Sequence, residues 1–281
     1  MSWSPPGPAL LFCPADRPER FTKAAAGADV VIVDLEDGCH PQRRDTARQA
    51  LAQTPLDAQR TIVRVNPATS PEHAADLDAV ARAGYDVVML AKAESPQQVS
   101  AIDAQVVALV ETPMGALRAA EIAAAAGCVG MMWGAEDLVA GLGGGSSRFA
   151  DGTYRDVARH VRSTVLLAAG AYGRFAVDAV HLDIADHAGL RAEAEDAVAL
   201  GFAATACIHP SQVEVIRAAY APTEEQVAWA RRVLAAAEDT PGVFTLDGRM
   251  VDAPLFRQAQ AIADRAGISR PPRTPTEGPP H

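Results

Sequence analysis

Charged side chains recur along the chain at or near the ends of short apolar runs. In chain order they are Asp34, Glu36, Asp37, Arg64, Lys92, Glu111, Glu136 and Asp137. If the runs are parallel strands of one barrel, their carboxyl ends meet at one rim and these side chains converge on one cavity. A single rim charge is as often a solvated loop residue or a helix cap. The repetition over five or six runs favours a functional site.

Two carboxylates, Glu111 and Asp137, follow neighbouring runs and predict a Mg²⁺ site. Proteins usually hold Mg²⁺ with one or two carboxylates and leave the other positions to water and substrate oxygens. No His or Cys stands near them to favour zinc. Each carboxylate alone is also explained by its place at a helix N-terminus, where the helix dipole favours negative charge. The metal prediction therefore depends on the pair.

Three basic side chains are candidates for chemistry. Arg64 lies inside an apolar run, so it needs a carboxylate partner, and we expect Glu36 or Asp37 together with the substrate. Lys92 could form a Schiff base, but an ion pair with a rim carboxylate is the favoured interpretation. His209 is either a catalytic base or a hydrogen-bonded scaffold residue, and its sequence context does not separate the two.

Eight short apolar runs alternate with longer helical patterns, as expected for parallel strands joined by crossover helices. The predicted fold is of the α/β class, a (β/α)8 TIM barrel, with an open doubly wound sheet as the alternative. The expected strands span residues 10–15, 29–37, 60–66, 86–92, 106–112, 129–134, 177–183 and 204–210.

We expect a barrel catalytic domain over residues 1–215 and a C-terminal lid extension over 216–268, followed by a disordered tail over 269–281. The lid is expected to contain helices and a hairpin with Asp247-Gly248 at its turn. The tail is rich in Pro, Arg and Thr and has too little apolar surface to offset its ordering entropy. The glycine-rich run 143–147 predicts a flexible loop in preference to an anion site, since it lacks the Gly-Lys-Ser/Thr ending of a phosphate loop.

The charge and cysteine content exclude several classes of protein. A net charge of -10 argues against nucleic-acid or membrane partners, which need a basic surface. The four cysteines are scattered without the spacing of a zinc or redox site. Because the N-terminus lacks the pattern of a signal peptide and no apolar run reaches the length of a membrane span, we expect a cytoplasmic protein.

A series of short strings resembles, in order, the motifs of the citrate lyase β-subunit-like family within the HpcH/HpaI aldolase superfamily. The resemblance covers about residues 9–260 and is strongest to stand-alone β-hydroxyacyl-CoA lyases. One departure follows Gly38, where this chain has Cys39-His40-Pro41-Gln42-Arg43 and many members carry a Lys. The strings are Cys13-Pro14-Ala15-Asp16-Arg17, Asp34-Leu35-Glu36-Asp37-Gly38, Arg64-Val65-Asn66, Lys92-Ala93-Glu94, Val110-Glu111-Thr112, Gly134-Ala135-Glu136-Asp137-Leu138, Ile208-His209-Pro210-Ser211-Gln212 and Gly248-Arg249-Met250-Val251-Asp252-Ala253-Pro254.

The resemblance implies roles for particular residues. Glu111 and Asp137 would hold Mg²⁺, while Arg64, oriented by Glu36, would contact the 2-oxo or hydroxy oxygen of the substrate. The backbone of the segment Gly134, Ala135 and Glu136 would receive the substrate carboxylate. CoA would lie near Arg17, Arg20, Lys23 and His209.

The resemblance also implies a homotrimer in which the lid presents Asp252 to the active site of a neighbouring subunit. The expected reaction is cleavage of a β-hydroxyacyl-CoA to a 2-oxo acid and acetyl-CoA, with citramalyl-CoA favoured over malyl-CoA and citryl-CoA. Mg²⁺ and Arg64 would stabilise charge on the oxygen, and Asp252 would protonate the enolate carbon. The alternatives are a Schiff-base aldolase using Lys92, a malate-synthase-like condensing enzyme, and a non-autonomous subunit acting on a citryl acyl-carrier protein.

Overall fold

The computed structural model of the chain describes residues 2–239 and 242–268. Its contacts divide the chain into two compact units, Met1–Ala219 and Tyr220–His281, which are described separately below. The predicted disordered tail, 269–281, lies outside the described residues. No helix in the described part of the chain has both the length and the apolar character needed to cross a membrane.

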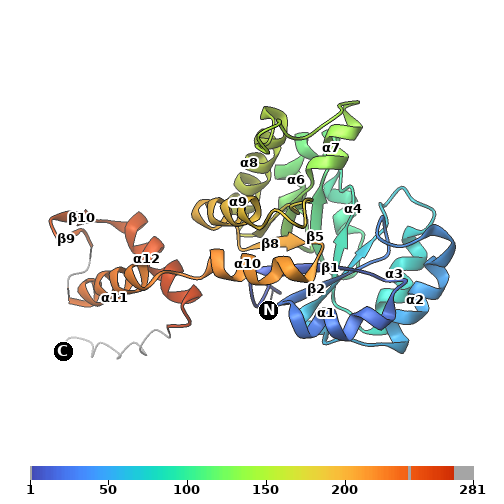
Figure 1. The fold of residues 1–281 in the computed structure, drawn as a ribbon, viewed down its shortest axis with the longest axis horizontal. Helices are drawn as coiled ribbons and strands as arrows, with labels where there is room; N and C mark the ends of the chain where they lie inside the picture. The colour runs from blue at the N-terminus through green and yellow to red at the C-terminus, as the bar shows by residue number, and fades with distance from the viewer. Residues whose placement is uncertain (1, 240–241, 269–281) are drawn as a thin grey trace, which may run out of the picture. The chain divides into compact units, whose positions relative to one another are not determined.

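The first unit is a closed barrel of eight parallel strands that follow one another in chain order (Figure 1). The predicted α/β barrel is therefore confirmed, and the alternative of an open doubly wound sheet is wrong. The strands are mostly shorter than predicted, because hydrophobic pattern alone does not show where backbone pairing stops. They are β1 Ala9–Pro14, β2 Val30–Asp34, β3 Thr61–Val65, β4 Val87–Leu90, β5 Gln105–Val110, β6 Cys128–Trp133, β7 Phe175–Asp178 and β8 Ala204–Cys207.

Helices connect the strands, and local sequence explains where several of them begin and end. Ser95 and Gln98 form a capping box at the start of α4, and Gly84 ends α3 in the left-handed conformation. Two short helices, α5 and α6, follow β5 and are separated at Arg118. The α-helices of this unit are α1 Phe21–Gly27, α2 Arg44–Gln53, α3 His73–Ala83, α4 Pro96–Ser100, α5 Pro113–Leu117, α6 Ala119–Ala124, α7 Ala135–Gly141, α8 Asp156–Ala171, α9 His187–Leu200 and α10 Pro210–Tyr220, whose last residue belongs to the second unit.

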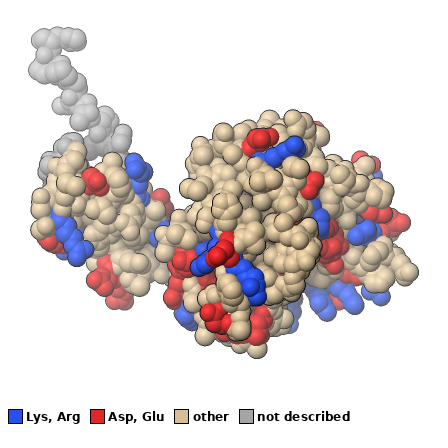
Figure 2. Space-filling model, turned by 90° about the horizontal axis from the view of Figure 1, so that it is seen from above, with Lys and Arg blue, Asp and Glu red and all other residues tan. Residues whose placement is uncertain are grey.

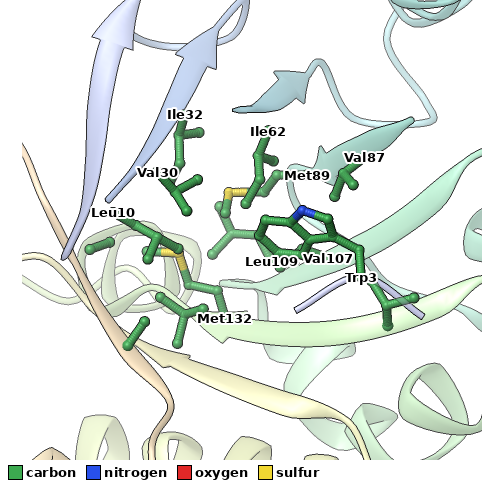
Figure 3. Close-up of a cluster of buried hydrophobic side chains, with 14 residues drawn as sticks. Trp3, Leu10, Val30, Ile32, Ile62, Val87, Met89, Val107, Leu109 and Met132 are labelled. Atoms are coloured by element: carbon green, nitrogen blue, oxygen red, sulfur yellow. The ribbon is translucent and has the colours of Figure 1, made fainter. Parts of the chain in front are cut away.

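The barrel interior is filled by apolar side chains to which all eight strands contribute (Figure 3). Trp3 lies against this cluster and closes the amino end of the barrel. Its backbone amide donates to the Gln105 side chain at 2.6 Å, and its indole donates to the Gln59 carbonyl at 3.0 Å. With the amino end filled, the carboxyl ends of the strands remain as the place for a cavity.

The second unit has a small core of its own. It contains α11 Glu224–Asp239, the antiparallel pair β9 Phe244–Leu246 and β10 Arg249–Val251, and α12 Ala253–Arg265. Asp247 and Gly248 connect the two strands with φ of 51° and 76°. Positive φ at both positions is what a two-residue type I′ hairpin turn requires, so the predicted hairpin is confirmed.

The surface and the thiols agree with what the composition indicates. Acidic and basic side chains are mixed on the face of the protein drawn in Figure 2. All four cysteines are buried and free, and burial raises the pKa of each thiol, that of Cys13 to about 11. These thiols therefore contribute to the core rather than to redox chemistry.

Candidate active site

A cavity of about 390 Å³ lies at the carboxyl ends of the barrel strands. Residues at or just beyond the ends of β2, β3, β5 and β6 supply its polar lining, which consists of Asp34, Asp37, Arg64, Glu111, Glu136 and Asp137. Its apolar wall includes Phe12, Leu109, Met132, Val180, Leu182 and Ile208. The fold thus brings six of the eight predicted rim charges to the lining of one cavity, while Glu36 and Lys92 contact lining residues.

Arg64 is held by a carboxylate that the sequence reasoning did not assign to it. Its Nε and Nη2 donate to the two oxygens of Asp34 at 2.7 and 2.6 Å, while Glu36 lies at 3.3 Å from Nη1. Glu36, one of the two expected partners, therefore does pair with Arg64, but the residue that binds the guanidinium through both oxygens is Asp34. The reason for the difference is the strand register, which pairs Asp34 of β2 directly with Arg64 of β3. Knowledge of this register would have identified Asp34.

Glu36 lies between two cations. Besides Arg64 it accepts a hydrogen bond at 2.5 Å from Nζ of Lys92, and one oxygen also accepts from the Asp37 amide. Burial raises the pKa of Glu36 above its ordinary value, while Arg64 and Lys92 act in the opposite direction. Glu36 therefore pairs with both Arg64 and Lys92, and the role of orienting Arg64 toward a substrate stays a prediction.

Lys92 forms ion pairs at the rim rather than presenting a free amine. In addition to Glu36, its Nζ lies 3.3 Å from Asp37 and 3.4 Å from Asp137. Burial opposes the charge of Lys92, but the hydrogen bond to Glu36 and the carboxylates of Glu111 and Asp137 raise its pKa above the ordinary value. A Schiff-base lysine needs a depressed pKa, so the geometry supports the favoured ion-pair interpretation.

Glu111 and Asp137 provide two carboxylates suited to a hard divalent cation. Glu111 is 3% exposed, and burial, followed by the negative charge of Asp137, raises its pKa from 4.5 to about 8. A Cβ on Gly134 would lie only 2.8 Å from Oε2 of Glu111, so glycine leaves that oxygen accessible.

The residues present fit magnesium better than zinc. Within residues 2–239 and 242–268, no three His, Cys, Asp or Glu side chains form a group that could hold a metal. Two carboxylates with other positions left to water and substrate are a usual arrangement for Mg²⁺, whereas zinc sites use more protein ligands.

The first turn of α7 lies beside these carboxylates. Gly134 is its N-cap residue, and the Gly134 amide already donates to the Val110 carbonyl. The amides of Ala135 and Glu136 lie in the first helical turn, which has no acceptor within the helix. Of the three backbone donors predicted for the substrate carboxylate, two are therefore suited to it.

Glu136 also has a side-chain partner that the sequence did not reveal. Ser147, 2% exposed, donates to Oε1 of Glu136 at 2.5 Å. The glycine-rich run predicted as a flexible loop thus ends in a buried serine that contacts a cavity residue. The sequence does not predict this contact, because it depends on how the loop between residues 136 and 147 folds back.

The residues expected near CoA lie in two places. Arg17, Arg20 and Lys23 are exposed and follow β1 on the 3-10 turn Pro18–Arg20 and on α1. His209 is exposed at the start of α10, where its Nδ1 lies 2.8 Å from the Ser211 hydroxyl and accepts from the Ser211 amide. This local bonding supports the scaffold interpretation of His209 over that of a catalytic base.

Asp252 belongs to the second unit. It is the N-cap residue of α12, and its Oδ1 accepts a hydrogen bond from the Leu255 amide at 3.3 Å. Its presentation to a neighbouring subunit stays a prediction.

Comparison with known proteins agrees with this geometry. The sequence pattern of a family described as HpcH/HpaI aldolase/citrate lyase matches residues 9–210. The chain belongs to the HpcH/HpaI aldolase/citrate lyase family. The resemblance inferred from the motifs is confirmed, and the protein is an enzyme of the aldolase-type lyases.

Individual members of the family are similar over nearly the whole chain. The citrate lyase subunit beta-like protein of Mycobacterium tuberculosis is 61% identical over 262 residues, which cover 93% of this chain and 96% of that protein. A crystal structure of CitE from Mycobacterium tuberculosis, in complex with magnesium, acetoacetate and coenzyme A, matches with a TM-score of 0.87 and covers 93% of this chain and 98% of that one at 61% identity. The mitochondrial citramalyl-CoA lyase of Rattus norvegicus is 28% identical over 296 residues, covering 93% of this chain and 86% of that protein.

Proposed function

We propose that this enzyme is a Mg²⁺-dependent β-hydroxyacyl-CoA lyase that cleaves citramalyl-CoA to pyruvate and acetyl-CoA. The observation that supports this most is the pair Glu111 and Asp137 at the cavity beside Arg64. The related CitE structure contains magnesium and coenzyme A, and a second relative is a citramalyl-CoA lyase. Bound at the two carboxylates, Mg²⁺ would polarise the substrate oxygen that becomes the 2-oxo group.

The residues around the cation would stabilise charge, bind the substrate carboxylate and transfer a proton. Arg64, fixed by Asp34 and Glu36, supplies positive charge next to the oxygen on which negative charge develops. The first-turn amides of α7 at Ala135 and Glu136 receive the substrate carboxylate. We propose that Asp252 of a neighbouring subunit in a homotrimer protonates the enolate carbon, and that Arg17, Arg20 and Lys23 meet the CoA phosphates.

The cavity lining favours a methyl group on the 2-oxo acid over a further carboxylate. The apolar wall offers Phe12, Met132 and Val180 to a methyl substituent. Citryl-CoA would bring an extra carboxylate, yet among the described residues that line the cavity Arg64 is the one basic side chain, and it is already paired with Asp34. An unpaired buried carboxylate is costly, so citramalyl-CoA is the better fit. Malyl-CoA lacks only the methyl, a difference of about 1–3 kcal/mol in a hydrophobic pocket.

The decisive experiment is an assay of the purified chain with citramalyl-, malyl- and citryl-CoA, with Mg²⁺ and with EDTA. We expect acetyl-CoA release that is fastest with citramalyl-CoA and stops with EDTA. Release of free CoA would instead indicate the malate-synthase-like reaction. Activity only on an acyl-carrier-protein thioester would indicate the non-autonomous subunit.

The Schiff-base alternative has a separate test. Borohydride in the presence of a 2-oxo acid would label Lys92 if that alternative held, and the site is easily mapped because Lys23 is the only other lysine. We expect no label on Lys92.

A further inference from the structure

Lys92 has a backbone conformation that requires explanation. It lies just beyond β4 with φ of 50°. Among the non-glycine residues that the structure describes, only Asp247 shares a positive φ, and it lies in the hairpin turn. A lysine in this left-handed region is uncommon and is retained where the surrounding contacts fix it.

The contacts of Lys92 reach both carboxylates of the proposed cation site. Its backbone amide donates to Oε1 of Glu111 at 3.0 Å, and its Nζ lies 3.4 Å from Oδ1 of Asp137. The same Nζ donates to Glu36, which lies against Arg64. One residue thus connects the proposed metal ligands to the group that orients Arg64.

The charges explain what this arrangement does. The ammonium supplies one positive charge to Glu36, Asp37 and Asp137, all within 3.4 Å. A cation at Glu111 and Asp137 shares the Asp137 carboxylate with the ammonium, and two positive charges at this range repel each other. The ammonium therefore weakens metal binding, while it keeps Glu36 in place for Arg64.

Resting on the proposed function, we propose that Lys92 is a positioning residue with two separable effects: its amide holds Glu111, and its ammonium limits the affinity for Mg²⁺ while it fixes Glu36 beside Arg64. Loss of the ammonium should consequently change metal binding and turnover in opposite directions. A purely structural role would make both worse together, and a Schiff-base role would require the amine itself.

The test measures Mg²⁺ binding to the metal-free, full-length protein by titration calorimetry, together with kcat and KM on the preferred acyl-CoA. Lys92→Met removes the charge and keeps the length of the side chain. Lys92→Gly also removes the charge and adopts φ of 50° without strain, so it serves as a second charge-free variant if Lys92→Met does not fold. Lys92→Arg keeps the charge without a primary amine. Arg217→Met is the control, because Arg217 is a cation of similar exposure that pairs with Asp29 and Glu214 away from the cavity.

In Lys92→Met and Lys92→Gly we expect the Kd for Mg²⁺ to fall about tenfold, because a repelling charge is removed, and kcat to fall while KM changes little. Lys92→Arg should return the Kd to within about twofold of wild type and recover part of kcat. Arg217→Met should leave the Kd unchanged. A Kd that is unchanged or higher in both charge-removing variants overturns the proposed role of Lys92 and leaves the proposed function untouched. Wild-type protein that binds no Mg²⁺ overturns this inference together with the proposed function.

Discussion

The Arg64 guanidinium at the barrel rim is paired with two carboxylates. Its side chain is 11% exposed, and Asp34 and Glu36, which are buried, lie within 3.3 Å of it. Lys92 repeats this pattern with Glu36, Asp37 and Asp137. Among the rim carboxylates Asp34, Glu36 and Glu111, which are buried in the described part of the chain, the first two contact a cation directly, whereas Glu111 meets a backbone amide and burial raises its pKa to about 8. Glu111 is the residue whose charge most needs a further cation.

Replacing Glu111 by alanine tests its assignment to the metal. We expect Glu111→Ala to lower kcat by more than about a hundredfold, since loss of a group that merely supports a metal ligand typically costs 10–100-fold. The measurement is steady-state kinetics with saturating Mg²⁺, with circular dichroism to verify the fold. Near-normal turnover would remove Glu111 from the mechanism.

Glu111 should also make stability depend on pH in the metal-free protein. Its pKa is higher in the folded chain, about 8, than its ordinary value of 4.5. Stability associated with this group is therefore fully present at low pH and is lost as the pH rises from about 4.5 to 8. Glutamine does not titrate, so we expect Glu111→Gln to raise the Tm relative to wild type by an amount that grows across this window. Thermal unfolding at several pH values, with EDTA present, measures it, and a constant difference would contradict the expectation.

At the scale of elements, the start of α7 matters because its backbone passes close to the side chain of Glu111, a proposed metal ligand. Gly134 leaves room for Glu111, and the helix that follows carries Asp137 in its first turn. The strand β5 and this helix therefore set the separation of the two carboxylates. The same glycine has a φ of −129°, which any residue can adopt, so its requirement is one of space.

The variant Gly134→Ala isolates that requirement. A Cβ would lie 2.8 Å from Oε2 of Glu111, and we expect it to displace the carboxylate and lower kcat by on the order of a hundredfold, as misplacement by about 1 Å can do. Gly145→Ala is the matched control, because its Cβ would have no neighbour within 4 Å. Equal kinetics for the two variants would show that the carboxylate tolerates displacement.

The sequence predicts features that depend on local patterns and misses those that depend on contacts between distant segments. Alternation of apolar runs and helices identifies the eight strands and the barrel, because each strand is a local pattern. Strand register is not local, so the partnership of Asp34 with Arg64 was missed although both residues were visible. The hydrogen bond of Ser147 to Glu136 depends on the path of a loop, which no pattern encodes. That Glu111, Asp137 and Arg64 lie at one cavity could be predicted, because strand ends in a barrel share one rim.

At the scale of the whole molecule, the barrel and the C-terminal unit are proposed to complete one another across subunits. Asp252 is held at the start of α12 by the Leu255 amide, so its backbone position is fixed within its own unit. If it serves a neighbour, the metal ligands and the acid of one active site come from different chains.

Mixing two inactive variants tests this division. We expect Asp252→Asn alone to lower kcat by about 10²–10⁴, the usual cost of losing a general acid. Glu111→Ala supplies an intact Asp252, so co-expression of the two variants should yield mixed oligomers that recover a measurable fraction of wild-type activity. Activity of the mixture equal to the mean of the separate variants would place both groups in one chain.

The way Trp3 seals the amino end of the barrel has a practical consequence. Its indole and backbone amide are both bonded to groups at the base of the strands, and its ring meets Phe175 edge-on at 5.6 Å. Trp3 thus closes the amino end of the barrel interior. Removal of residues 2–8 would take away this side chain and open the amino end of the barrel interior to water, so a shortened protein that is to stay folded should keep Trp3.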